Sequence, residues 1–168
     1  MPGDARQAVT ALYQAHAVGL IRLAVVMLGD REAAEDVVQE AFCGLYRRWE
    51  HLSAQANALP YVRSSVLNGC RTLLRHRNRR QARVAAGARP LETAESAEAS
   101  ALVSEEHREV LAALRRLPDR QREALVLRYY LELAEPEIAQ SMGVSQGTVK
   151  STTSRALAAL GRLVQEAR

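Results

Sequence analysis

The chain has 168 residues, enough for one ordinary domain or two small ones. Its abundance of alanine, leucine, valine and arginine, with one Trp, five Tyr and one Phe, favours helix over strand. The net charge of +4 makes a polyanionic partner plausible. Its two cysteines, Cys43 and Cys70, match no zinc-ligand spacing and are too few for a disulfide framework. We expect reduced helix residues, with a redox-sensing disulfide as the less favoured alternative.

The N-terminus lacks the apolar core of a signal peptide, and no apolar run approaches the ~20 residues that a membrane span needs. We therefore expect a cytoplasmic protein with no membrane partner.

Three long helices are expected in the first half of the chain. Apolar residues recur at helical spacing on one face of the first, from about residue 5 to residue 28. Asp30 can cap the second, which runs from about residue 31 to residue 49. The third begins near Pro60 and ends in the basic run at 75–80.

The composition then changes. Residues 81–104 are small, polar and partly acidic, which predicts a flexible linker. Helices are expected over 105–117 and 119–132, and no strand has good support. The sequence thus predicts an all-α fold of two small helical domains, residues 5–80 and 105–168, joined by this linker.

Residues 135–154 are the most informative part of the chain because they predict a helix-turn-helix. Ala139 falls where two helices cross closely, Gly143 where the turn needs a positive φ, and Val149 where a side chain returns to the shared core. Ser145 fits the N-cap of the second helix. Such a helix can lie in the DNA major groove, although a helical hairpin or an ordinary solvated face is the alternative. The residues expected on its exposed side, suited to phosphates and base edges, are Gln146, Lys150, Ser151, Ser154 and Arg155.

A basic stretch lies on the third expected helix. Six arginines and no acid occur between Tyr61 and Arg80, which suits sequence-independent contact with phosphates. Asn68 lies about one turn before Arg71 and two turns before Arg75, and its amide can read a base edge. A solvated basic helix end, favoured by the helix dipole, is the alternative.

The second expected helix carries a negative patch. Asp36, Gln39 and Glu40 lie within about one turn. Because negative charge repels DNA, this patch suits a basic protein partner better, with a solvated face as the alternative. The sequence shows no Gly-rich phosphate loop, no HExxH and no nucleophile motif, so neither an enzyme nor a cofactor is expected.

Together these features resemble a bacterial RNA polymerase sigma factor of the small extracytoplasmic-function (ECF) type. The likeness rests on AEDVVQEAF at residues 34–42 and on the block from LPDRQREAL to TSRALAAL at residues 117–160, in the family's order. It extends over about residues 9–80 and 105–164. Abundant alanine and arginine beside a single lysine are typical of a high-GC, for example actinobacterial, source.

The resemblance implies a role for each segment. Asp36, Gln39 and Glu40 would dock on the clamp helices of core RNA polymerase. The loop 52–59 would help recognise the −10 promoter element, where a flipped base is read on its exposed edges. The helix-turn-helix would read the −35 element. The residues implied at the −10 element are Ser53, Gln55, Asn57, Tyr61, Asn68, Arg71 and Arg75.

The predicted function is therefore that of a sigma factor, which binds core polymerase and promoter DNA and promotes −10 melting without chemistry of its own. The family often uses an anti-sigma factor, which is a further candidate partner. Three departures from the family's pattern are Tyr61 for a frequent Trp, Thr72 for an acidic or amide residue, and Ala134 for a frequent Ser cap. The alternative function is a stand-alone helix-turn-helix regulator, which leaves the N-terminal half unexplained. An enzyme acting on nucleic acid would need a catalytic constellation that the sequence lacks.

Overall fold

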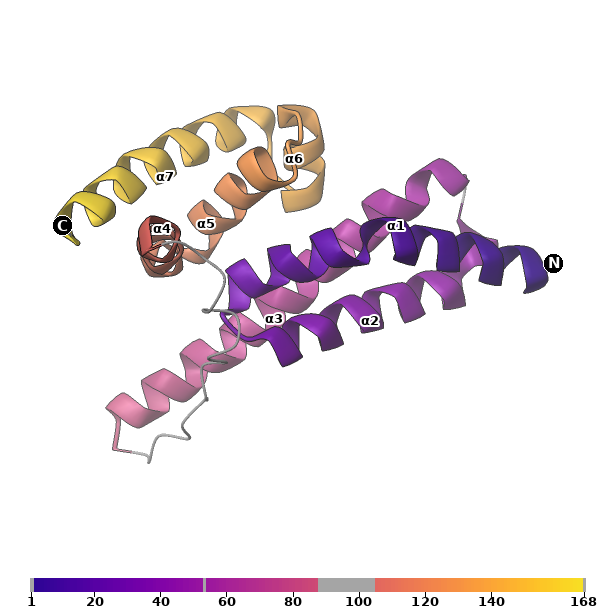
Figure 1. Ribbon diagram of the computed structural model, residues 1–168, viewed down its shortest axis with the longest axis horizontal. Helices are drawn as coiled ribbons and strands as arrows, with labels where there is room; N and C mark the ends of the chain where they lie inside the picture. Colours follow the sequence, from indigo (N-terminus) through magenta and orange to yellow (C-terminus); the bar gives the residue numbers. More distant parts are fainter. Residues whose placement is uncertain (1, 53, 88–104, 168) are drawn as a thin grey trace.

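The N-terminal half is a bundle of three long helices (Figure 1). The computed structural model describes residues 2–52, 54–87 and 105–167. The elements of this half are α1 (Pro2–Leu28), α2 (Arg31–Arg48), the short 3-10 turns η1 (Trp49–His51) and η2 (Gln55–Asn57), and α3 (Ala58–Ala85). Ser53 and residues 88–104, most of the expected linker, lie outside the described residues.

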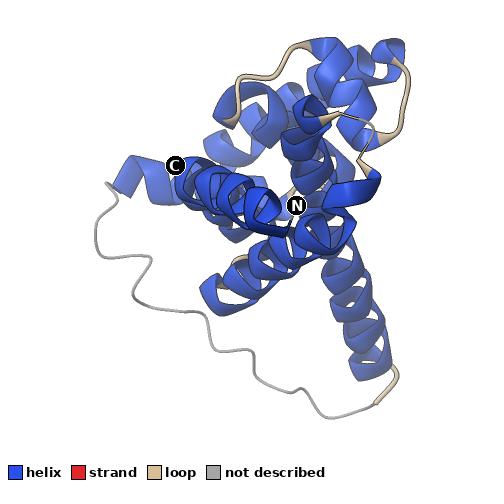
Figure 2. Cartoon of the chain, turned by 90° about the vertical axis from the view of Figure 1, so that its right-hand side faces the viewer, coloured by secondary structure: helices blue, strands red, loops and turns tan. Residues whose placement is uncertain are grey.

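The C-terminal half is a second helical unit. Its elements are α4 (Glu105–Arg116), α5 (Asp119–Leu125), the π-helical turn η4 (Val126–Tyr130), α6 (Glu135–Met142) and α7 (Gln146–Glu166). Across the described ranges every regular element is helical, and Figure 2 shows no strand there. The predicted all-α fold class is confirmed.

The helix ends follow the local chemistry expected from the sequence. Gly29 ends α1 at φ +69°, and Asp30 caps α2 by accepting a hydrogen bond from the Ala33 amide at 3.1 Å. Gly143 has φ +66°, the conformation that the turn of the helix-turn-helix was expected to need. Ser145 caps α7 by accepting from the Thr148 amide at 3.2 Å.

Two elements differ from expectation. α3 continues to Ala85, past the expected end at Arg80, because the intervening residues are good helix formers despite their change in composition. The expected single helix over 119–132 instead widens at η4, where the Leu131 amide bonds to the Val126 carbonyl, five residues back, at 3.1 Å. Apolar periodicity does not distinguish such a turn from an α-helical one.

α1 is longer and more apolar than we expected from the sequence. By length and composition alone, Asp4–Leu28 could cross a membrane, so the expectation that no segment approaches a membrane span was wrong. Core helices of soluble proteins pass the same test. Here α1 packs against both α2 and α3, with Leu23 and Ala24 fully buried.

The two halves share one buried apolar cluster. Leu23 of α1 and Val66 of α3 belong to the same cluster as Leu127, Ile138 and Met142 of the C-terminal unit. α6 packs on α3, while α4, α5 and η4 pack on α1. The C-terminal unit therefore rests on one side of the bundle, and the end of α3 projects beyond it (Figure 1).

Candidate nucleic-acid and polymerase interfaces

The α6–α7 pair has the arrangement expected of a helix-turn-helix. Ile138, Met142 and Val149 are buried between the helices and the rest of the protein. This burial fixes the rotation of α7, so its opposite side faces outward. The residues predicted to read DNA are all exposed on that side: Gln146, Lys150, Ser151, Ser154 and Arg155.

Two of these side chains make exposed contacts within the α6–α7 pair. The Lys150 ammonium lies 3.8 Å from the carboxylate of Glu135 on α6. The guanidinium of Arg155 donates to the Ser151 carbonyl at 3.2 Å and to its hydroxyl at 3.3 Å. Exposed pairs of this kind contribute little. Lys150 and Arg155 can therefore give up these contacts for contacts to phosphates or bases with little loss of free energy.

The acidic face of α2 is also exposed. Asp36, Gln39 and Glu40 all face solvent, as their spacing predicts. Glu40 accepts a hydrogen bond from Arg47 at 2.6 Å, and this bond raises the pKa of the Arg47 guanidinium. Arg47 thus partly neutralises the patch, a contact that the sequence analysis missed although the two residues lie two helical turns apart.

An apolar groove of about 530 Å³ adjoins this face, between α1 and α2. Its walls include the rings of Phe42 and of Tyr13, which pack edge to face with centroids 5.0 Å apart. Gln39 belongs both to the acidic face and to the groove. The groove's lining residues are Val9, Thr10, Tyr13, Gln39, Phe42, Cys43, Tyr46 and Arg47.

The residues predicted for the −10 element fall into two groups. Gln55 and Asn57 are exposed on η2, and Tyr61 is half-buried at the start of α3. Arg75 is exposed farther along α3 and donates to the Thr72 hydroxyl at 3.4 Å. The second group is Asn68, which is exposed, and Arg71, which is half-buried, and both take part in contacts that reach the C-terminal unit. Ser53 lies outside the described residues.

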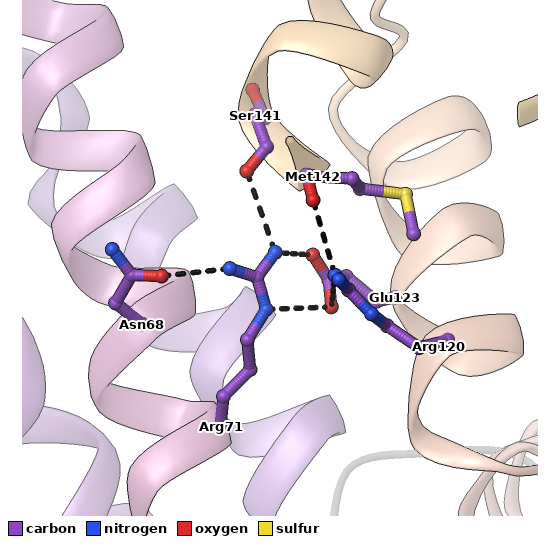
Figure 3. A network of polar contacts seen from close by, with 6 residues as sticks. All are labelled: Asn68, Arg71, Arg120, Glu123, Ser141 and Met142. Carbon is purple, nitrogen blue, oxygen red and sulfur yellow. Dashed lines mark hydrogen bonds and ion pairs between the residues drawn. The ribbon is translucent and has the colours of Figure 1, made fainter. Parts of the chain in front are cut away.

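Asn68 and Arg71 face the C-terminal unit (Figure 3). The Arg71 guanidinium forms a two-pronged ion pair with Glu123 of α5, including an Nε–Oε2 bond of 3.1 Å. It also donates to the Asn68 amide oxygen at 2.7 Å and to the Ser141 carbonyl of α6 at 3.4 Å. Both predicted −10 residues therefore lie in a polar network between the halves.

The sequence analysis missed the partner side of this network. Glu123 is 1% exposed, and Arg120 lies 3.6 Å from its carboxylate while donating to the Met142 carbonyl at 3.3 Å. The available signal was Glu123 itself, which lies one turn before the core residue Leu127 on the same face of its helix. A carboxylate at such a position needs a cationic partner.

Arg77 also departs from the predicted basic run. Its guanidinium donates to the Leu28 carbonyl at the end of α1 and lies 3.3 Å from the carboxylate of Asp30. Arg77 therefore joins α3 to the α1–α2 turn, while Arg75, Arg79 and Arg80 are exposed. Within the described residues no cluster of three or more His, Cys, Asp or Glu is placed to hold a metal ion.

Comparison with known proteins decides the family. The family model described as Sigma-70 region 2 matches residues 12–80, and the one described as Sigma-70, region 4 matches residues 107–160. The ECF RNA polymerase sigma factor SigL of Mycobacterium tuberculosis is 31% identical over 159 residues, covering 93% of this chain and 88% of that protein. The chain belongs to the ECF sigma factors.

Other relatives agree. The RNA polymerase sigma-E factor of Streptomyces coelicolor is 33% identical over 144 residues, 84% of this chain and 77% of that protein. RfaY of Xanthomonas campestris, described as a probable RNA polymerase sigma factor, is 34% identical over 140 residues. That match covers 81% of this chain but only 35% of RfaY.

Solved structures support the fold of this sigma factor. The sigma factor RpoE of Bartonella quintana, solved in complex with the anti-sigma factor NepR, superposes with a TM-score of 0.73 at 23% identity, covering 98% of this chain and 99% of that one. CnrH, solved with the cytosolic domain of CnrY, gives 0.71 at 24% identity, covering 96% and 95%. Sigma factors bind core RNA polymerase and promoter DNA, so the matches favour a promoter-directing sigma factor over a stand-alone regulator.

Proposed function

We propose that this sigma factor docks on core RNA polymerase through the acidic face of α2 and the adjoining groove. The support is the conjunction of exposed Asp36, Gln39 and Glu40 with apolar walls that include Phe42. Charge complementarity would guide encounter with a basic helix. The apolar groove would then add the buried contact that gives an interface most of its affinity.

The −35 element would be held by α7. Lys150 and Arg155 are exposed cations on the outward side of a helix-turn-helix, which suits phosphates and guanine edges. Gln146, Ser151 and Ser154 would contact base edges. Of all the observations, the outward polar face of α7, whose rotation is fixed by buried Ile138, Met142 and Val149, supports promoter recognition most directly.

The −10 element would be captured by the start of α3 and the turn before it. Gln55 and Asn57 offer exposed amides, and Tyr61 offers a ring for stacking on an unpaired base. Asn68, Arg71 and Arg75 would continue this surface once α3 is free. Binding single-stranded DNA more tightly than duplex favours melting, so the protein needs no catalysis of its own and acts as a factor in the cytoplasm.

The residue ranges 5–80 and 105–168 would act as separate domains during initiation, one for each promoter element. An anti-sigma factor is proposed as a regulatory partner, since both structural relatives were solved with an anti-sigma factor or with a cytosolic partner domain.

Co-elution with purified bacterial core RNA polymerase on size exclusion tests the docking proposal. The wild-type chain should co-elute stoichiometrically at moderate salt, and the double variant Asp36→Arg/Glu40→Arg should not. Asp4→Arg/Glu166→Arg is the matched control, because it makes the same change in net charge at two exposed acids that belong neither to α2 nor to the lining of the groove. Undiminished co-elution of the α2 variant would rule out the proposed docking face.

A further inference from the structure

Glu135 and Lys150 form an ion pair between the two helices of the helix-turn-helix. The Lys150 ammonium lies 3.8 Å from a carboxylate oxygen of Glu135. Glu135 is the first residue of α6, and Lys150 is the fifth residue of α7. In a helix-turn-helix the first helix crosses the DNA backbone, and the N-terminal residues of the second contact base edges. Because Lys150 belongs to the outward face of α7, its acidic partner lies beside the surface that we propose for the −35 duplex.

A carboxylate at such a surface needs a reason, because it repels the DNA phosphates. Glu137, two residues farther along, has one: its carboxylate accepts a hydrogen bond from the Ala134 amide at 3.0 Å, at the start of α6. Glu135 instead reaches across to α7. An exposed ion pair adds little to the stability of a fold. The stability of the α6–α7 pair therefore does not account for Glu135.

The two partners of this pair differ in freedom. The side chain of Glu135 is 31% exposed, whereas that of Lys150 is 70% exposed. Lysine carries its ammonium on a flexible four-carbon stem, so the half-buried carboxylate is the better fixed of the two. Glu135 thus sets where the ammonium lies. Together they present a hydrogen-bond donor and a hydrogen-bond acceptor side by side.

The major-groove edge of a G·C base pair carries the complementary groups side by side. Guanine offers O6 and N7 as acceptors, and cytosine offers its N4 amino group as a donor. O6 and N4 are hydrogen-bonded to each other within the base pair, so they lie about 2.9 Å apart. An ammonium and a carboxylate 3.8 Å apart can therefore meet O6 and N4 at the same time.

The other base pairs fit less well. A reversed pair, C·G or A·T, sets the ammonium against an amino group and the carboxylate against a carbonyl oxygen, so both contacts are repulsive. A T·A pair keeps the favourable order, with thymine O4 and adenine N6. However, it replaces the second acceptor, guanine N7, by the thymine methyl group, which cannot accept a hydrogen bond from the ammonium.

We propose that Glu135 and Lys150 together read one G·C base pair of the −35 duplex, with Lys150 on the guanine and Glu135 on the amino group of its cytosine. Glu135 is then a specificity-determining residue contributed by α6. The inference rests on the proposed function of α7 for duplex binding, and on the ion pair for the choice of base pair. The ammonium brings a positive charge to the groove whichever group it contacts, so Lys150 still contributes to the salt dependence of binding.

Selection from a pool of duplexes with a randomised central segment tests this inference on the full chain, because the outward face of α7 is exposed in the free protein. The motif enriched by the wild-type chain should contain a G·C position preferred at least about tenfold over every other pair. A good bidentate contact discriminates between bases by about 5- to 150-fold. Lys150→Gln should abolish the preference at that position.

Glu135→Gln should change the preference at the same position and nowhere else. An amide pairs well with adenine N6 and N7, whereas a carboxylate only accepts, as from cytosine N4. We therefore expect the advantage of G·C over T·A to fall about tenfold. Base preference is the appropriate readout because the loss of the carboxylate charge also relieves repulsion from phosphates, which raises the affinity for every sequence.

Glu166→Gln is the matched control. It makes the same chemical change at an exposed ion pair with Arg116, about 24 Å farther along α7 than Lys150. It should enrich the wild-type motif, and circular dichroism would establish that each variant keeps its helices.

Three outcomes would count against the inference. If Glu135→Gln enriched the wild-type motif, the base-reading role of Glu135 would be overturned while the −35 role of α7 stood. If the Glu135 and Lys150 variants changed different positions, or a position that is not G·C in the wild-type motif, joint reading of a G·C pair would be wrong. If the wild-type chain enriched no motif at all, the −35 role of α7 would fail, and this inference with it.

Discussion

Gly69 of α3 lies so close to Val37 of α2 that a Cβ on the glycine would stand 2.8 Å from the valine Cγ1. Real Cβ atoms do not tolerate such a separation, so Gly69→Ala must push the helices apart or twist the valine. We expect a net loss of about 1–2 kcal/mol in the free energy of unfolding, since overpacking at 1–3 kcal/mol outweighs the better helix propensity of alanine. Urea denaturation measures this.

Gly161→Ala on α7 is the matched control. A Cβ there meets nothing within 4 Å, so only the gain in helix propensity, about 0.5–1 kcal/mol, should remain. If both variants shifted the urea midpoint in the same direction, the close contact of α2 and α3 would not be what restricts position 69.

Arg77→Ala should destabilise the protein, although Arg77 belongs to a basic run that suggests DNA contact. The substitution removes charged hydrogen bonds to the Leu28 carbonyl and to Asp30, worth about 1–3 kcal/mol together. Arg79→Ala, at an exposed position, should leave the thermal midpoint unchanged. Equal midpoints for the two variants would contradict the structural role of Arg77.

Cys43 and Cys70 should differ sharply in reactivity. Cys43 is exposed on α2, whereas burial raises the pKa of the Cys70 thiol to about 12. At pH 8 we expect one thiol per chain to react quickly with a disulfide reagent under native conditions, and two in denaturant. If both thiols reacted quickly in the native protein, Cys70 would not be buried as the structure shows.

The raised pKa of Cys70 also makes the free energy of unfolding depend on pH in a defined direction. Below the ordinary thiol pKa of 9.0, folded and unfolded chains are both protonated and this group adds no pH dependence. As the pH rises from there toward about 12, the unfolded state loses its proton first, so the free energy of unfolding falls. Cys70→Ala should flatten that part of the profile in urea titrations at several pH values.

Lys150→Ala should weaken binding of a −35 duplex and reduce the slope of log K against log salt by about 1, as expected when one phosphate contact is lost. Arg162→Ala is the control. It removes the same charge from the same helix, but ~18 Å farther along the axis. Identical salt slopes for both variants would place the DNA surface somewhere other than the predicted face of α7.

The sequence predicted what depends on neighbouring residues. The caps at Asp30 and Ser145 and the positive φ of Gly143 follow from local chemistry, and the structure confirms them. The exposed faces of α2 and α7 follow from helical periodicity, and they too are exposed as predicted. The functions assigned to those faces stay predictions.

What the sequence could not give depends on residues far apart in the chain. Arg71 and Glu123 are separated by 52 positions, and no periodicity pairs them. The wide turn at η4 changes one backbone bond without changing the apolar pattern. In the sequence Arg77 cannot be distinguished from its basic neighbours, because its partners Leu28 and Asp30 lie 49 and 47 positions away.

Because α3 and α5 belong to one chain, their meeting is an intramolecular event. A contact of this kind forms at an effective concentration of the order of millimolar. The two halves can therefore have a low intrinsic affinity for each other and still stay together. A single cut between Gly87 and Glu105 would leave every described contact intact, yet would make their association depend on dilution.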